Sequence, residues 1–191
     1  MYNVRAEAIQ ILEQQAENQE IDLYYGDESG FSEQGYSPYA WQFKDEKIVI
    51  PVSHGQQINC FGLLTRQNKF HFKTTTQSIG SAFLIAFFDL FVIDLKKISV
   101  VVLDNAKIHR SKAFKKRIEY WEKRGLFFVY LPPYSPHLNI IEKLWFELKQ
   151  RCIRPEDYAS FETLQYALQL TLMTVGNEIK INFNKFNFRK K

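Results

Sequence analysis

Two aspartates occupy positions from which a carboxylate can act on a bound group. Asp104 ends a largely apolar run that begins at Ser99, a pattern that predicts a strand buried on both faces. The C-terminal ends of such strands commonly open at functional sites. Asp27 ends a second predicted strand, residues 21–27, and its alternation gives it the same face as the apolar side chains of Ile21, Leu23 and Tyr25.

A third acid, Glu142, falls on a predicted helix. Ser135 is a suitable N-cap and Pro136 a suitable first helical residue, so we expect a helix that begins there, runs towards Arg151 and carries Glu142 in its second turn. Apolar residues recur at spacings of three and four and predict the buried side of this helix: Leu138, Ile141, Leu144, Trp145 and Leu148. Glu142 then lies at the edge of the core.

A carboxylate on a largely apolar face raises the free energy of the fold unless another group compensates its charge. The compensating group that requires the fewest residues is a divalent metal ion shared by Asp27, Asp104 and Glu142. The three acids therefore predict a metal site.

The acids also stand in three ordered sequence blocks that together resemble a known family. The blocks are Asp27-Glu28-Ser29-Gly30-Phe31, then Val102-Leu103-Asp104-Asn105-Ala106-Lys107-Ile108-His109, then Pro132-Pro133-Tyr134-Ser135-Pro136 followed by Leu138-Asn139, Ile141-Glu142 and Trp145. Over about residues 20–150 the chain is similar to the DDE catalytic domain of the Tc1/mariner superfamily, in particular to its bacterial insertion-sequence transposases. The resemblance implies that Asp27 and Asp104 are the two catalytic aspartates and Glu142 the third acid.

The chemistry that this resemblance implies is phosphoryl transfer on DNA. Two Mg²⁺ or Mn²⁺ ions about 3.5–4 Å apart can activate the attacking oxygen and stabilise the leaving one. We expect Asp27 to bridge both ions, Asp104 to bind one and Glu142 the other. Water would first nick the transposon end, and the freed 3′-hydroxyl would then attack target DNA. Terminal inverted repeats and a TA target are implied by the family alone.

Three polar residues near the acids are candidates for a supporting role. Asn105 and Asn139 flank two of the acids and could hydrogen-bond to them, although either residue could equally be a simple cap or turn former. His109 could orient a phosphate or a water, or be a helix-start histidine satisfied by backbone. Glu28 should face away from Asp27 and is left out of the metal set, and Tyr134 and Trp145 are interpreted as structural.

A basic segment follows Asp104. It carries eight lysines and arginines between positions 107 and 124 against only Glu119 and Glu122. A solvated helix face explains such a run equally well, but its position beyond a predicted metal-binding aspartate favours contact with DNA phosphates. The candidate DNA-binding residues are Arg110, Lys112, Lys115 and Lys116. The basic and aromatic tail after Lys180 is read first as a partly docked terminus and second as a nucleic-acid contact.

The remaining pattern predicts an α/β fold of the ribonuclease H-like type, with a mixed sheet of about five strands flanked by helices. An antiparallel meander should precede the parallel strands, with strand-like runs at residues 47–52, 57–64 and 69–73. Residues 76–95 predict a helix whose four phenylalanines belong to the core. The segment after Asp104, around residues 114–123, predicts a helix with Ala113, Phe114, Ile118 and Trp121 inward. Residues 126–131 predict a further buried strand.

Three regions are expected along the chain. Residues 1–20 predict a leading helix with an apolar stripe at Val4, Ala8, Ile11 and Leu12, residues 21–152 the catalytic domain, and residues 153–191 a C-terminal helix and basic tail. Twenty leading residues are too few for the helix-turn-helix modules that normally precede this domain. We therefore expect a catalytic piece, a second reading frame completed by frameshifting, or a decayed remnant.

Composition bears on the partner of the protein, on its cysteines and on its compartment. The net charge of +4 is compatible with a DNA partner. Cys60 and Cys152 lack the spacing of a zinc site or a disulfide framework. We expect a cytoplasmic, nucleoid-associated protein without a membrane span, for which a homodimer is a candidate assembly. Two alternatives stay open: a metal-dependent nuclease that cuts but never joins, and an inactive DNA-binding remnant.

Overall fold

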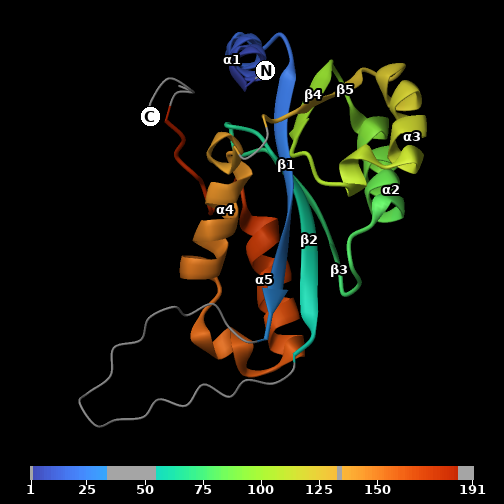
Figure 1. Ribbon diagram of the computed structural model, residues 1–191. Coiled ribbons are helices and arrows are strands. Elements are labelled where there is room, and N and C mark those ends of the chain that lie inside the picture. The colour runs from blue at the N-terminus through green and yellow to red at the C-terminus, as the bar shows by residue number, and fades with distance from the viewer. Residues whose placement is uncertain (1, 34–54, 133–134, 185–191) are drawn as a thin grey trace.

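A mixed sheet forms the centre of the protein, as the sequence predicts. The computed structural model describes residues 2–33, 55–132 and 135–184. These residues form a five-stranded sheet of order β3-β2-β1-β4-β5 (Figure 1). The antiparallel part consists of β1 (Asp22–Ser32), β2 (Gln57–Leu64) and β3 (Phe70–Thr75), and β4 (Ser99–Leu103) and β5 (Leu126–Tyr130) continue it in parallel with β1. The strand predicted at residues 47–52 lies outside the described residues.

Helices cover both faces of the sheet (Figure 1). The helices α2 (Ser81–Phe91) and α3 (Lys112–Glu122) pack on one face, and α1 (Tyr2–Glu17), α4 (Ile141–Glu147) and α5 (Phe161–Thr174) on the other. The sheet therefore has a hydrophobic core on each face, the first under α2 and α3 and the second under α1, α4 and α5. Because side chains alternate along a strand, Tyr24 belongs to the first core and Tyr25 to the second. The α2 phenylalanines pack in the first core, which confirms their structural reading.

Four local expectations were wrong. The helix expected from Pro136 begins at Ile141, because residues Pro136–Leu138 form a separate 3-10 turn, and Glu142 therefore lies in the first helical turn. Ser135 does not cap this turn through its side chain. Ala113 is exposed, although Phe114 and Trp121 are buried as expected. The β5 strand is an edge strand on which only Leu126 is fully buried.

The predicted stripe of α1 was also wrong. Val4 and Ile11 are 68% and 61% exposed, whereas Ala6 and Ile9 are buried against the domain. The face that packs includes the polar side chain of Glu13, which a count of apolar residues does not find.

The C-terminal segment is fastened to two distant parts of the fold. Asn68, in the β2–β3 turn, donates to the Ile181 carbonyl at 3.1 Å and accepts from the Ile181 N–H at 2.7 Å. Lys143 of α4 donates to the Asn182 carbonyl at 2.6 Å, and Arg66 donates to the Asn184 carbonyl at 2.7 Å. Up to Asn184, the tail is therefore docked. In the described part of the chain, helices are too short or too polar to cross a bilayer.

Candidate active site

Asp27 lies on β1, and Asp104 directly follows the last residue of the neighbouring strand β4. The parallel pairing of β1 with β4 matches Tyr25 with Val102, and each aspartate lies two residues further along its own chain segment. Paired strands are about 4.8 Å apart, and residues two apart share a face. The two carboxylates therefore emerge side by side where β4 ends and β1 continues.

Glu142 reaches this place because α4 is anchored to the strand that carries Asp27. The Asn139 amide donates to the Gly26 carbonyl at 3.3 Å, and the Glu142 N–H donates to the Asn139 carbonyl at 3.2 Å. Asn139 thus links the start of α4 to the residue before Asp27. The Glu142 side chain is exposed and lines a hollow of about 360 Å³ beside Asn139.

Trp145 makes a second attachment one helical turn later. Gly62 pairs with Asp27 across β1 and β2, and the Trp145 ring lies over Gly62 so closely that an added Cβ would be 2.9 Å from it. Trp145 also contacts Phe31 edge to face. Its structural interpretation fits this buried position, and only a glycine at position 62 lets α4 approach the strand.

Negative charge is in excess around Asp27. Burial, followed by the negative charges of Glu142 and Glu28, raises the pKa of Asp27 to about 8, and Asp104 adds to this effect. Both other acids are therefore near enough to Asp27 to act on its charge. Two protein cations offset part of this charge, Lys149 and His109.

Lys149 was missed by the sequence analysis. Burial lowers its pKa, while the negative charges of Glu142 and Asp27 act in the opposite direction. The ammonium lies 5.3 Å from the centre of the Phe31 ring. Lys149 lies in a short π-helix, Leu148–Cys152, that follows α4, and its approach to the acids depends on tertiary packing.

His109 bridges two acids from a fully buried position. Its Nδ1 is 2.8 Å from Asp104 Oδ1, and its Nε2 is 3.0 Å from Glu28 Oε1. Burial alone would lower the pKa of His109, but the hydrogen bonds to Asp104 and Glu28 outweigh it and raise the pKa to about 9. The hydrogen bond from His109 in turn lowers the pKa of Asp104. Glu28 faces away from Asp27, as expected, yet belongs to the same charge network.

The two asparagines act on the backbone. Asn105 donates to the Leu131 carbonyl at 2.6 Å and Asn139 to the Gly26 carbonyl. The expected hydrogen bonds from these amides to the acids are absent from the described residues. Both asparagines instead fix the loops that carry Asp104 and Glu142.

The predicted DNA-binding residues have exposed side chains. Arg110 belongs to the 3-10 turn Ile108–Arg110, and Lys112, Lys115 and Lys116 follow on α3. Arg117 of the same basic run has a structural partner, because its guanidinium binds both carboxylate oxygens of Asp89 at 2.9 and 3.1 Å.

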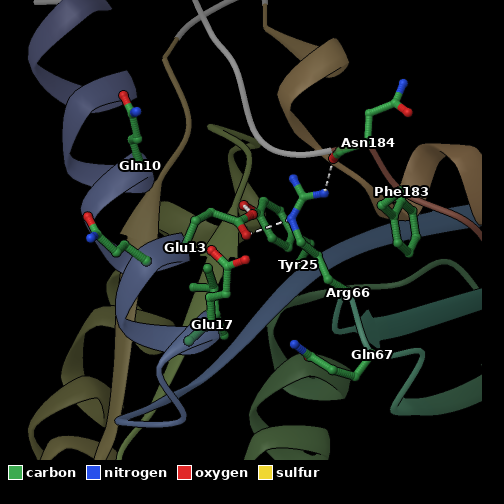
Figure 2. A pocket seen from close by; sticks show the side chains of 11 residues that line it. Gln10, Glu13, Glu17, Tyr25, Arg66, Gln67, Phe183 and Asn184 are labelled. Carbon is green, nitrogen blue, oxygen red and sulfur yellow. Dashed lines mark hydrogen bonds and ion pairs between the residues drawn. The ribbon is translucent and has the colours of Figure 1, made fainter.

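A second polar cluster lies on the same face of β1 and lines a pocket of about 410 Å³ (Figure 2). Glu13 of α1 accepts a hydrogen bond from the Tyr25 hydroxyl and another, at 2.6 Å, from Arg66 Nε. Figure 2 shows Arg66 reaching from Glu13 to the Asn184 carbonyl. The charge of Glu13 is compensated by Arg66 of the same chain. We therefore interpret the cluster as a structural one that connects α1, β1 and the C-terminal segment.

The acidic site fits a divalent cation by its chemistry. It offers the hard oxygen donors that Mg²⁺ and Mn²⁺ prefer, and the raised pKa of Asp27 marks an excess of negative charge that a cation would relieve. In addition, Asn139 Oδ1 is buried without a hydrogen-bond partner among the described residues. Within those same residues, no three acid, histidine or cysteine side chains are close enough to enclose an ion as they stand. Of the three acids, Glu142 has an exposed side chain, whereas Asp27 and Asp104 are partly buried.

The chain is similar to known proteins both in sequence and in fold. A family model described as DDE superfamily endonuclease matches residues 22–165. No protein of curated function matches the sequence significantly.

Three solved structures illustrate the shared fold. The Mos1 strand transfer complex has a TM-score of 0.61 at 15% identity and covers 88% of this chain and 52% of that chain. A mariner Mos1 paired-end complex with Mg has a TM-score of 0.59 at 15% identity, covering 88% and 53%. The catalytic core domain of BIV integrase has a TM-score of 0.52 at 12% identity, covering 83% and 86%.

The chain thus spans about half the length of the Mos1 transposase chains that it matches. These similarities identify the ribonuclease H-like fold of transposase and integrase catalytic cores.

Proposed function

The chain belongs to the DDE superfamily endonuclease family, and on that premise we propose that it cuts transposon ends and joins the freed 3′-hydroxyl to target DNA. The observation that carries this proposal is the attachment of α4, which bears Glu142, to the backbone next to Asp27, in a sheet whose neighbouring strand β4 ends just before Asp104. Burial first, and then the charges of Glu142, Glu28 and Asp104, raise the pKa of Asp27. Terminal inverted repeats and target DNA are the proposed substrates.

We propose Mg²⁺ or Mn²⁺ as the cofactor, held by Asp27, Asp104 and Glu142. When bound, two such ions supply an activated attacking oxygen and stabilisation of the leaving oxygen during in-line displacement. The paired-end Mos1 complex with Mg supports this choice of metal.

The chain's own residues would position the DNA around the acids. Lys149, next to Asp27 and Glu142, is suited to hold a phosphate near the cleaved bond, because an ammonium group is a compact point charge. Arg110, Lys112, Lys115 and Lys116 would contact the phosphates further along the duplex. In this proposal, the same site serves cutting and joining because only the attacking oxygen changes, from water to the 3′-hydroxyl.

Nicking of a supercoiled plasmid in Mg²⁺ and in Mn²⁺ tests the proposed chemistry. The wild type should convert the plasmid to the open circle, and Asp104→Ala should not. Asp94→Asn is a matched control, because this exposed aspartate lies before β4, at the opposite end of that strand from Asp104. If wild type and Asp104→Ala are equally inert across metals and salt concentrations, the chain is an inactive DNA-binding remnant.

A second assay separates a transposase from a nuclease that only cuts. A duplex carrying the repeat that flanks the gene, already cleaved to expose its 3′-hydroxyl, is incubated with a target plasmid. Joined products support transposition. Nicking without any joined product would assign the site to a nuclease.

A further inference from the structure

We propose that Glu28 is a positioning residue for the active site, which acts on Asp104 through His109. This inference rests on the proposed role of Asp104 as a metal-binding acid. Glu28 lies next to Asp27 in the sequence but on the opposite face of β1, among the side chains that α2 and α3 cover. From there it reaches the buried side of His109.

The three residues form a continuous hydrogen-bonded chain. Glu28 Oε1 is 3.0 Å from His109 Nε2, and His109 Nδ1 is 2.8 Å from Asp104 Oδ1. Both ring nitrogens of His109 are therefore engaged, each by a carboxylate oxygen. A histidine that donates through one nitrogen to Glu28 is fixed in ring orientation for the bond that its other nitrogen makes.

The side chains that surround the His109 ring are largely aromatic. Its side chain has 0% exposure, and the rings of Phe61 and Phe114 lie around it, both 6.4 Å away between centroids. These rings enclose the imidazole but cannot accept a conventional hydrogen bond from it. Among the described residues, Glu28 provides the acceptor that sets the rotation of the ring.

Asp104 needs such support because it has left the sheet. It follows the last residue of β4, and its side chain is 47% exposed. Two hydrogen bonds orient it, one from the Ala106 N–H at 2.9 Å and one from His109, and both end on Oδ1. Oδ2 is thereby left for a ligand, and the direction of Oδ2 depends on the His109 bond that Glu28 holds in place.

A set of variants tests this chain. Glu28→Ala removes the acceptor, whereas Glu28→Gln keeps an oxygen that can accept from Nε2. His109→Ala and the double variant Glu28→Ala/His109→Ala complete a double-mutant cycle. Glu122→Gln is the matched control, because Glu122 is an exposed acid on α3 with no hydrogen bond or ion pair among the described residues.

The first measurement is Mn²⁺ binding to the DNA-free protein by titration calorimetry. Loss of a residue that orients a metal ligand typically weakens metal affinity by about 10–100-fold, so Glu28→Ala should raise the Kd for Mn²⁺ within that range. Glu28→Gln should restore most of the affinity and Glu122→Gln should leave it unchanged. If Glu28 acts through His109, the double variant should lose no more affinity than His109→Ala alone.

The second measurement needs neither metal nor DNA. In the metal-free protein, ¹H–¹⁵N spectra of labelled histidine should show the His109 Nδ1–H protected from exchange by its bond to Asp104. Glu28→Ala should remove this protection and Glu28→Gln should retain it. Unchanged Nδ1–H protection in Glu28→Ala would overturn the positioning role, as would strictly additive losses of Mn²⁺ affinity in the cycle.

The two measurements separate the two proposals. A wild type that binds no Mn²⁺ contradicts the proposed metal site, and the protection of Nδ1–H still decides whether Glu28 positions Asp104.

Discussion

Two carboxylate clusters lie on the same face of β1 and differ in how far cations of the chain compensate their charge. Glu13 meets the Tyr25 hydroxyl and the Arg66 guanidinium, so its charge is compensated within the chain. Two residues along the strand from Tyr25, Asp27 meets Glu142 and Asp104, and its pKa rises. A fold built for stability alone would pair the second cluster as it pairs the first. The second cluster, whose negative charge is only partly offset by His109 and Lys149, is therefore where the chain is prepared to bind a cation.

The largest effect should come from neutralising the second cluster. Asp27→Asn should lower the rate of plasmid nicking by at least about 10³-fold, because metal-assisted charge stabilisation amounts to several kcal/mol. The same substitution should make the metal-free protein more stable, since it removes the repulsion with Glu142. Nicking and thermal unfolding measure the two effects, and a stability loss together with normal nicking would contradict the comparison.

In the cluster of Glu13, Tyr25 and Arg66, a neutralising substitution should lower stability and leave nicking nearly unchanged. Glu13→Gln should lower the free energy of unfolding by about 2–3 kcal/mol, because it leaves Arg66 without its carboxylate in a site where both side chains are largely buried. The nicking rate of the folded protein should stay within about twofold, since Glu13 takes no part in the proposed chemistry. Denaturant unfolding provides the measurement, with the exposed Glu7→Gln on the same helix as control.

A third prediction concerns pH. The folded pKa of Asp27 is about 8 against an ordinary value of 3.8, so the folded state holds a proton that the unfolded state has released. Stability should then fall as pH rises from about 4 to about 8. His109, with a folded pKa of about 9, contributes stability below about 6.5 that is lost as pH rises through 9.

Denaturant unfolding of the metal-free protein at pH 5 and pH 8 measures this dependence. The wild type should lose about 1–3 kcal/mol over this range relative to Asp27→Asn. Equal slopes for the two proteins would show that Asp27 is not perturbed.

A smaller effect is expected at Lys149, the lysine that partly offsets the acidic cluster. Lys149→Gln should reduce nicking by about tenfold at saturating metal, because one phosphate-positioning charge is lost near the cleaved bond. The Kd for Mn²⁺ in the absence of DNA should fall or stay the same, since a competing cation has gone. Lys123→Gln, on an exposed residue paired with Glu119, is the control. A weaker Mn²⁺ affinity in Lys149→Gln would contradict this role.

The smallest effect should come from the exposed basic face. Substituting Lys112, Lys115 and Lys116 together by Gln should reduce the slope of log affinity against log salt by about 2–3, roughly 0.9 for each lost phosphate contact. The rate of nicking at saturating DNA should be unchanged. An unaltered salt slope would assign these lysines to a solvated helix face.

The sequence predicted the elements that carry the acids where the signal was local or belonged to a motif. Alternation along β1 gave the face of Asp27 and the apolar run of β4 gave the place of Asp104, because strand periodicity is set by neighbouring residues. The predicted end of the first strand at Asp27 was wrong, since β1 continues to Ser32. The motif around Glu142 placed that acid on the right helix. The start of the helix was wrong because the Asn139 side chain bonds to the backbone of β1, a partner distant in the sequence.

The residues that sequence reasoning missed all act through tertiary contacts. Glu28 matters because it crosses to His109, and Lys149 because a π-helix carries it towards the acids. The apolar stripe predicted for α1 failed for a related reason. That helix buries Glu13 against a tyrosine and an arginine from other elements, and hydrophobic periodicity cannot detect a polar contact of this kind.

The attachment of the C-terminal segment to Lys143 and Arg66 has a consequence for synthesis of the protein. The helix that bears Glu142 is held through Lys143 by the Asn182 carbonyl, which the ribosome makes some forty residues later. A nascent chain can thus complete the sheet with both aspartates and attach α4 through Asn139 and Trp145 before the Lys143 contact forms. The contact between Lys143 and Asn182 is therefore the last of these attachments of α4 to be synthesised.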